Sequence, residues 1–309
     1  MGQLDGKVDR PEPGTRERIA ARIVGREREL ELALAAVGSG RDLVMEGPPG
    51  TSKTTMLKAI TEEWGIPLFF VEGNADLTPT KLVGHHNPAR VLKEDYSADT
   101  FVAGPLARAM ETGGFLYIEE FNRAPEDTLN TLLTAMADRQ IEVPRVGLIR
   151  AEPTFRVIAS MNPFDNVGTT RLSTSVSDRL NRIVFGYQDA ESEEGIVRLR
   201  SHLEGALADR IVPDAVAVTR ATRTHPDVRQ GSSVRGAIDS ALITSELASL
   251  RDLTDPDDER YPETFFDAMV VALSGRIHLD EAAETTPERV LREIWEDHFI
   301  LEPARATPG

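Results

Sequence analysis

The 309-residue sequence predicts an α/β fold in which helices flank a five-stranded, largely parallel sheet and an all-helical second domain follows. Three observations predict it. A Gly/Pro-rich turn stands between a short apolar run and a helical pattern at residues 42–57. Other apolar runs of strand length alternate with helical or turn-rich stretches, and these strand signals fade after Tyr187. We therefore expect a flexible tail at 1–18, an α/β domain at 19–188 and a helical domain at 189–309.

The α/β domain opens with a predicted helix. Leu30, Leu34 and Val37 recur at helical spacing, and Gly38 marks a C-terminal stop. The apolar run Leu43, Val44 and Met45 is the first strand, and its helix extends to about Trp64. The remaining predicted strands are residues 68–71, 115–118, 155–161 and 183–187.

Helical patterns fill the rest of the chain. Residues 125–140 begin with Pro, carry acids in the first turn and place leucines on one face, which predicts a helix packed on the core. For the last helix, Thr286 is a suitable N-cap and Pro287 a suitable first residue. The helices expected in the second domain are residues 191–207, 213–222, 233–250, 262–273 and 287–299.

Composition limits the classes of function. No apolar run is long enough for a transmembrane span, and the N-terminus lacks the apolar region of an export signal, so we expect a cytoplasmic protein without membrane contact. The absence of cysteine excludes disulfides and thiolate metal sites. The net charge of −16 disfavours nucleic acid, since no cluster of Lys and Arg interleaved with aromatics offsets it. A protein partner is therefore expected.

The turn after the first strand has the pattern of a phosphate-binding loop, GPPGTSKT at residues 47–54. Gly47 and Gly50 allow backbone N–H groups to turn inward as an anion nest. Ser52 stands where this pattern normally has Gly, and we expect it to fit if its backbone stays near helical angles. The alternative is a plain Gly-rich turn. The predicted nucleotide-binding residues are Gly47, Pro48, Pro49, Gly50, Thr51, Ser52, Lys53, Thr54 and Thr55.

The second half of a nucleotide site follows in the sequence FLYIEEFNRAP at residues 115–125. An apolar strand ends in two acids, and the carboxyl ends of parallel strands face the ligand crevice. Glu119 would approach Mg²⁺ together with the Thr54 hydroxyl, while Glu120 would polarise the attacking water. The alternative is a pair of surface acids at a strand end.

These motifs, together with the later ASMNP at residues 159–163, resemble an AAA+ ATPase. The segment FNRAPEDTLNTLLTAMADRQIEV resembles the MoxR branch in particular, near its CbbQ, NorQ and GvpN-like members. The resemblance covers about 24–187 and continues weakly to about 248. It implies a P-loop AAA+ core with a C-terminal helical lid, ATP and Mg²⁺ as cofactors, and a ring of subunits. This sequence departs from the family at Glu119, where Asp is usual.

The resemblance also implies roles for residues outside the two motifs. Asn162 would be the sensor 1 residue, although Asn-Pro is also good turn chemistry. Arg179 matches the arginine finger given to a neighbouring subunit, and Arg182 is close enough to be confused with it. Arg235 resembles the sensor 2 arginine, with an i,i+4 ion pair to Asp239 as the alternative.

Two insertions are characteristic of the branch. Residues between Asn74 and Gly113 resemble the helix 2 insert, and residues 144–153 resemble the pre-sensor 1 hairpin. Asn74 itself resembles the residue that restrains the catalytic glutamate. His85 and His86 lack further ligands at metal spacing, so we interpret them as histidines of a pore-facing hairpin.

The two motifs predict a Mg²⁺-dependent ATPase, and the resemblance implies that it works in a ring, with a hexamer expected, and remodels or activates a partner protein or enzyme complex. A von Willebrand factor A domain protein is one kind of partner that the resemblance implies. Three alternatives remain open at this point: a DNA-directed AAA+ motor, a non-hydrolysing nucleotide-gated scaffold, and a small P-loop kinase or GTPase. The last lacks an NKxD guanine-specificity motif.

Overall fold

The computed structural model describes residues 14–94, 96–163 and 173–301. The chain divides into two compact units, with the boundary between Gly186 and Tyr187. Within the described ranges, none of the helices has the length and apolar character needed to cross a membrane.

The first unit is built on a five-stranded sheet in which every pairing is parallel. The spatial order is β2-β5-β8-β1-β9, so the strand before the phosphate loop lies inside the sheet. All five predicted strands are therefore confirmed, although the last begins and ends a few residues earlier than expected. The strands are β1 (Leu43–Glu46), β2 (Leu68–Glu72), β5 (Phe115–Glu119), β8 (Arg156–Met161) and β9 (Asn181–Val184).

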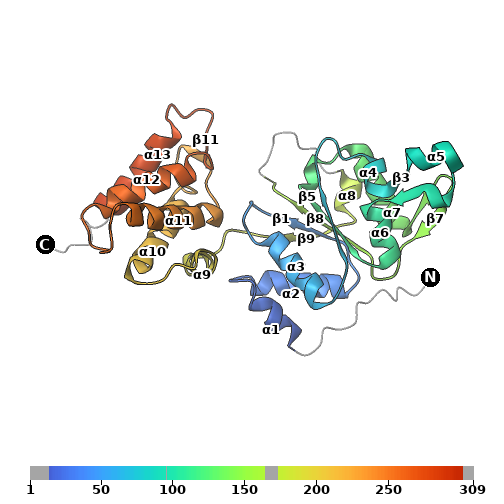
Figure 1. Ribbon diagram of the computed structural model, residues 1–309, viewed down its shortest axis with the longest axis horizontal. Helices are drawn as coiled ribbons and strands as arrows, with labels where there is room; N and C mark the ends of the chain where they lie inside the picture. Colours follow the sequence, from blue (N-terminus) through green and yellow to red (C-terminus); the bar gives the residue numbers. More distant parts are fainter. Residues whose placement is uncertain (1–13, 95, 164–172, 302–309) are drawn as a thin grey trace. The chain divides into compact units, whose positions relative to one another are not determined.

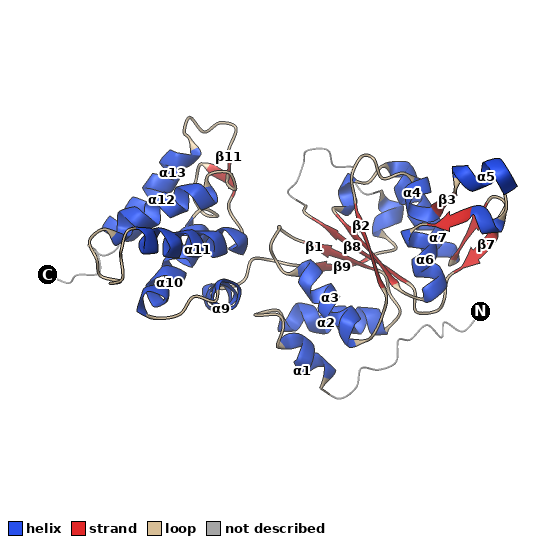
Figure 2. Ribbon diagram, in the orientation of Figure 1, coloured by secondary structure: helices blue, strands red, loops and turns tan. Residues whose placement is uncertain are grey.

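Helices lie on both faces of the sheet (Figure 1), and alternating side chains of the strands contribute to a separate hydrophobic core on each face. Leu43, Met45 and Tyr117 face one core, while Val44 and Ile118 face the other, as expected for period-2 strands buried on both faces. The first core is covered by α1 (Thr15–Ala20), α2 (Glu27–Gly38) and α3 (Lys53–Glu63). The second is covered by α4 (Pro79–Val83), α6 (Pro105–Thr112) and α7 (Glu126–Asp138), and Figure 2 shows helices on both sides of the strands.

The tail is shorter than predicted. Helix α1 begins at Thr15, so residues 15–18 are helical, because Thr15 and Ile19 are buried against the first core. Residues 1–13 lie outside the described residues.

Two antiparallel hairpins extend from the α/β unit. Strands β3 (Gly84–His86) and β4 (Phe101–Ala103) pair within the predicted helix 2 insert, with α5 (Pro88–Glu94) between them. Strands β6 (Gln140–Val143) and β7 (Gly147–Arg150) form the second hairpin, which starts four residues before the predicted 144–153. The helix before it ends at Asp138 because Arg139 turns left-handed, and Ile141, Val143 and Ile149 then alternate into the core.

The second unit is mainly helical and has its own core. The predicted helix start at Pro213 is wrong, since Pro213 lies inside a longer helix, α10 (Ala206–Ala221). A proline inside a helix costs about 3 kcal/mol, but apolar residues on both sides of it, such as Ile211 and Ala215, are fully buried. The Thr286 N-cap is present, with its side chain accepting from Arg289 N–H. The helices are α9 (Ala190–Ser201), α10 (Ala206–Ala221), α11 (Val234–Leu250), α12 (Tyr261–Leu273) and α13 (Pro287–Glu296), extended by a π turn at Asp297–Leu301.

Candidate nucleotide site

The predicted phosphate loop joins β1 to α3, with Lys53 as the first residue of the helix. The Lys53 ammonium lies inside the loop, where it donates to Gly47 O at 2.8 Å and to Pro48 O at 2.7 Å. The Thr51 hydroxyl donates to the same Pro48 carbonyl at 2.9 Å. These bonds hold the loop as a closed turn, and all nine predicted nucleotide-binding residues lie in it or in the first helical turn.

Ser52 does not have the near-helical backbone that the sequence analysis assumed. Its φ is 66° and its ψ is 15°, which is the left-handed region, and Gly50 also has a positive φ of 74°. The loop must reverse sharply so that its N–H groups converge ahead of α3, and two nearby left-handed residues achieve this reversal. A residue with a Cβ pays for that conformation with about 1–2 kcal/mol, so Ser52 is strained where Gly would not be.

The first glycine of the loop is held against the end of the sheet. A Cβ on Gly47 would lie 2.2 Å from the Phe185 carbonyl oxygen, which leaves no room for a side chain. Phe185 N–H in turn donates to Glu46 O at 2.7 Å. The phosphate loop therefore starts from a fixed position beside the segment that leaves β9.

Thr54 and Glu119 lie together, as the sequence analysis expected of a metal pair. The Thr54 hydroxyl donates to Glu119 Oε1 at 2.8 Å, although α3 and β5 are distant in the sequence. A hydroxyl and a carboxylate are the hard oxygen ligands that Mg²⁺ prefers, so these two residues fit the ion. Glu119 is one methylene longer than the Asp that is usual in the family it resembles, and its carboxylate contacts the hydroxyl directly.

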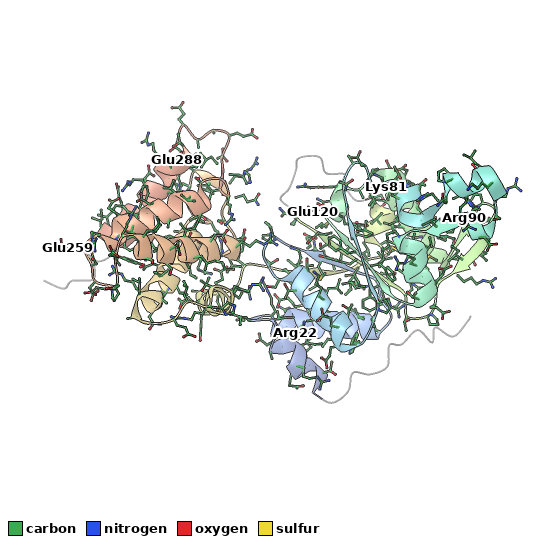
Figure 3. The ribbon with its side chains drawn as sticks, viewed as in Figure 1. Arg22, Lys81, Arg90, Glu120, Glu259 and Glu288 are labelled. Carbon is green, nitrogen blue, oxygen red and sulfur yellow. The ribbon has the colours of Figure 1, made fainter. Side chains whose placement is uncertain are left out.

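Glu120, which is labelled in Figure 3, follows β5. Its backbone is left-handed, with φ 52°. Its carboxylate lies 3.5 Å from the Arg123 guanidinium. A non-glycine residue in this region costs of order 1 kcal/mol or more, and such strain concentrates at functional sites. The conformation turns the second acid away from the line of the strand that carries Glu119.

Two residues that support this corner were not singled out from the sequence. Gly73 N–H donates to Glu119 O at 2.7 Å, which ties the end of β2 to the end of β5. Asn122 is buried, and its amide donates to the Asn162 carbonyl at 3.3 Å. Asn122 thereby connects the turn after β5 to the residue that follows β8. A glycine directly after a strand and an asparagine inside the FNRAP turn were the available signals.

The three predicted arginines lie in different places. Arg179 follows the short helix α8 (Thr174–Ser177) and donates to Ser175 O at 3.0 Å. Arg182 lies on β9, where it forms an ion pair with Glu46 at 3.2 Å, directly beside the phosphate loop. Arg235 is near the start of α11 in the helical unit.

The alternative reading of Arg235, an ion pair with Asp239, is not what the structure has. Asp239 pairs instead with Arg276 at 2.5 Å. Among the described residues, Arg235 has no ion pair of its own.

The remaining candidates have local partners. The Asn74 amide donates to Glu72 O at 3.3 Å and its Oδ1 accepts from Asp76 N–H at 2.9 Å, so both bonds close its own loop. His86 bridges the two hairpins, with its ring nitrogens 3.0 Å from Thr100 Oγ1 and 3.2 Å from Pro144 O.

The chain is similar to several known proteins. Residues 42–180 match the family model of the AAA domain, dynein-related subfamily. The gas vesicle ATPase GvpN1 of Halobacterium salinarum is 27% identical over 269 residues, covering 76% of this chain and 76% of that protein. The gas vesicle ATPase GvpN of Ancylobacter aquaticus is 27% identical over 270 residues, covering 81% and 72%. An uncharacterized protein of Staphylococcus aureus is 29% identical and covers 77% and 92%.

Among solved structures, RuvB of Thermotoga maritima, a Holliday junction branch migration motor, superposes with a TM-score of 0.52. It is 18% identical, covering 83% of this chain and 72% of that one, so the likeness concerns the fold alone. The fold, the loop and the named relatives together define an ATP-hydrolysing enzyme. Within that class, the chain is similar to AAA+ ATPases of the MoxR type, and the family model covers residues 42–180 of it.

Proposed function

We propose that this ATPase is Mg²⁺-dependent, works as a ring-shaped oligomer and uses ATP to remodel or activate a partner protein. The observation that carries the catalytic part is the 2.8 Å contact between the Thr54 hydroxyl and the Glu119 carboxylate. It sets two oxygen ligands side by side next to the loop that contains Lys53.

Each residue of the site then has a defined task. Lys53 exchanges the carbonyls of Gly47 and Pro48 for the β and γ phosphates, because a phosphate oxygen is a stronger acceptor for an ammonium than a neutral carbonyl. Thr54 and Glu119 hold Mg²⁺, which neutralises developing charge on the phosphates. Glu120 accepts the proton of the attacking water, and Asn162 orients that water.

Arg179 is our choice for the arginine finger. Arg182 is already paired with Glu46 of its own subunit, and freeing it would leave that carboxylate without its guanidinium. Among the described residues, Arg179 gives one side-chain hydrogen bond, to the Ser175 carbonyl of the preceding helix, which it can release at little cost. Arg182 then stabilises the base of the loop within one subunit, while Arg179 reaches the nucleotide of the next.

A mixing experiment tests the shared site. Glu120→Gln removes the base but leaves the finger, whereas Arg179→Ala removes the finger but leaves the base. Each variant alone should lose about 10³-fold or more in turnover. Mixed rings should regain roughly a quarter of the wild-type rate, because that share of randomly formed interfaces joins an intact base to an intact finger.

The same mixture with Arg182→Ala in place of Arg179→Ala is the control. Arg182→Ala alone should keep most of its turnover, so mixing it with Glu120→Gln should produce no gain. Recovery with Arg182→Ala and none with Arg179→Ala would assign the finger to Arg182. Full turnover by a stable monomer of the wild type would contradict the ring.

The client is proposed to be a protein, in the cytoplasm. The net charge of −16 argues against a nucleic acid as the substrate. The two hairpins that extend from the α/β unit are the segments that we propose to contact a protein substrate. Gas vesicle ATPases are among the relatives, and a von Willebrand factor A domain protein remains one expected partner class.

Capture of a client protein by Glu120→Gln rings loaded with ATP tests this proposal, and wild-type rings loaded with ADP are the control. A DNA mobility shift at physiological salt would contradict it.

A further inference from the structure

Three hydroxyl groups and one carboxylate form a continuous hydrogen-bonded row beneath the nucleotide site. Ser160 Oγ on β8 lies 2.8 Å from Tyr117 Oη on β5, and Tyr117 Oη lies 2.9 Å from Thr54 Oγ1. The row ends with the 2.8 Å bond from Thr54 to Glu119. Tyr117 is fully buried and Ser160 is 2% exposed, so the protein itself supplies these contacts.

The donor in each hydrogen bond of this row can be assigned by starting from Glu119, because a carboxylate can only accept. Each hydroxyl carries a single proton. The Thr54 hydroxyl donates its single proton to Glu119, so Tyr117 must be the donor in the hydrogen bond between Thr54 and Tyr117. Tyr117 has then spent its own proton, so Ser160 must donate to Tyr117. The direction of the whole row is fixed.

This direction decides how Thr54 presents its lone pairs. Its oxygen has two, and the Tyr117 donor occupies one while the proton points at Glu119. One lone pair is left, and its direction is set by the other two bonds. We propose that Tyr117 is a positioning residue that holds the Thr54 hydroxyl in the orientation for binding Mg²⁺. The inference rests on the proposed metal pair Thr54 and Glu119.

The position of Tyr117 supports a specific task for its hydroxyl. Its strand neighbours Phe115, Leu116 and Ile118 are apolar and fully buried, and the Tyr117 ring itself belongs to the core with Met56 and Leu57. Phenylalanine would fill the same space without bringing a polar group into that core. Burying a hydroxyl is costly unless it is hydrogen-bonded, and here both of its bonds lead to the row.

Tyr117→Phe tests the proposal through the effect of Mg²⁺ on nucleotide affinity. The affinity for a fluorescent ATP analogue is measured in excess EDTA and again in Mg²⁺, and the ratio of the two is the quantity of interest. With EDTA the variant should bind within about twofold of wild type, because the phosphate loop is unchanged. The Mg²⁺ enhancement should fall by about three- to tenfold, the equivalent of one hydrogen bond. The Mg²⁺ concentration for half-maximal hydrolysis should rise in parallel.

Tyr261→Phe is the matched control. Tyr261 is also a fully buried tyrosine, and its hydroxyl donates to Asp214 at 2.8 Å, but it lies in the helical unit. It should lose stability without changing the Mg²⁺ enhancement. If Tyr117→Phe does not fold, the double variant Tyr117→Phe, Ser160→Ala gives the same measurement, because it leaves no Ser160 hydroxyl unpaired.

The outcomes are distinct. An unchanged Mg²⁺ enhancement in Tyr117→Phe overturns the role of Tyr117 while the metal pair stands. Equal losses of affinity in EDTA and in Mg²⁺ also overturn it, because that pattern belongs to a merely structural residue. A wild type whose affinity does not respond to Mg²⁺ overturns the metal pair itself, and this inference with it.

Discussion

Gly73 lies so close to Glu120 that a Cβ on Gly73 would stand 2.3 Å from the Glu120 carbonyl oxygen. The nearest atoms are all backbone, with Glu119 O at 3.0 Å, so no flexible side chain can move aside. Glu120, the proposed catalytic base, has a left-handed backbone, and the end of the neighbouring strand supplies the surface against which that conformation is held. The absence of a side chain at Gly73 is therefore a requirement of the site.

We predict that Gly73→Ala displaces the turn that carries Glu119 and Glu120. ATP turnover should fall by more than about tenfold, since a misplacement of about 1 Å costs that much or more. The free energy of unfolding should fall by about 1–3 kcal/mol, as for other overpacked sites. A steady-state ATPase assay and urea denaturation measure the two effects.

Gly38→Ala is the matched control, because a Cβ on Gly38 meets no atom within 4 Å and its φ is not positive. This variant should keep the wild-type turnover, and its free energy of unfolding should change by no more than a few tenths of a kcal/mol. Wild-type turnover in Gly73→Ala would contradict this prediction, because it would show that the backbone at Glu119 and Glu120 can make room for a Cβ without loss of activity.

Ser52→Gly should stabilise the protein. The left-handed backbone at Ser52 is strained for any residue with a Cβ, so glycine should raise the free energy of unfolding by up to about 1 kcal/mol. Thermal melting and urea denaturation measure it. Ser52→Ala separates the backbone from the hydroxyl, since alanine keeps the strain and should bring no gain. If the Ser52→Gly variant is less stable than the wild type, the Ser52 hydroxyl must stabilise the loop by more than the backbone strain costs.

Asp42 should make stability depend on pH. Its half-buried carboxylate lies just before β1 and accepts from Val157 N–H at 2.7 Å, and desolvation raises its pKa above 3.8 despite that bond. The folded state then holds the proton more tightly than the unfolded state. This contribution to stability is complete below 3.8 and is lost as the pH rises through the folded pKa.

Asp42→Asn keeps the acceptor for Val157 and removes the charge. The free energy of unfolding of this variant, relative to wild type, should therefore increase between about pH 4 and pH 7. Urea denaturation at several pH values measures this. Asp42→Ala, which also loses the acceptor, should be less stable than Asp42→Asn at each pH. A difference that is flat or falls with pH would contradict the assignment.

The sequence predicted the strands and the helical second unit well, because both depend on patterns that persist over many residues. Val44 and Ile118 alternate with Met45 and Tyr117 between two cores, and such burial is visible as apolar runs. Single residues that oppose a local rule were harder. Proline is common at the start of a helix, but Pro213 lies inside α10, because the buried apolar residues on both sides of it stabilise a continuous helix.

Within the site, motif spacing identified Thr54 and Glu119 as neighbours, since both belong to patterns with a known geometric purpose. Ser52 was given the wrong backbone because its conformation depends on the reversal of the whole loop. Gly73 and Tyr117 were missed for another reason. Their importance lies in contacts across strands that are distant in sequence, and no local pattern records which atoms will meet.

His86 has a mechanical consequence. Its ring is bonded on one side to Thr100, at the base of β4, and on the other to Pro144, at the tip between β6 and β7. The β6 and β7 pair leads into β8, which ends just before Asn162. His86 therefore joins the two hairpins to each other, and we expect them to change position together and not independently.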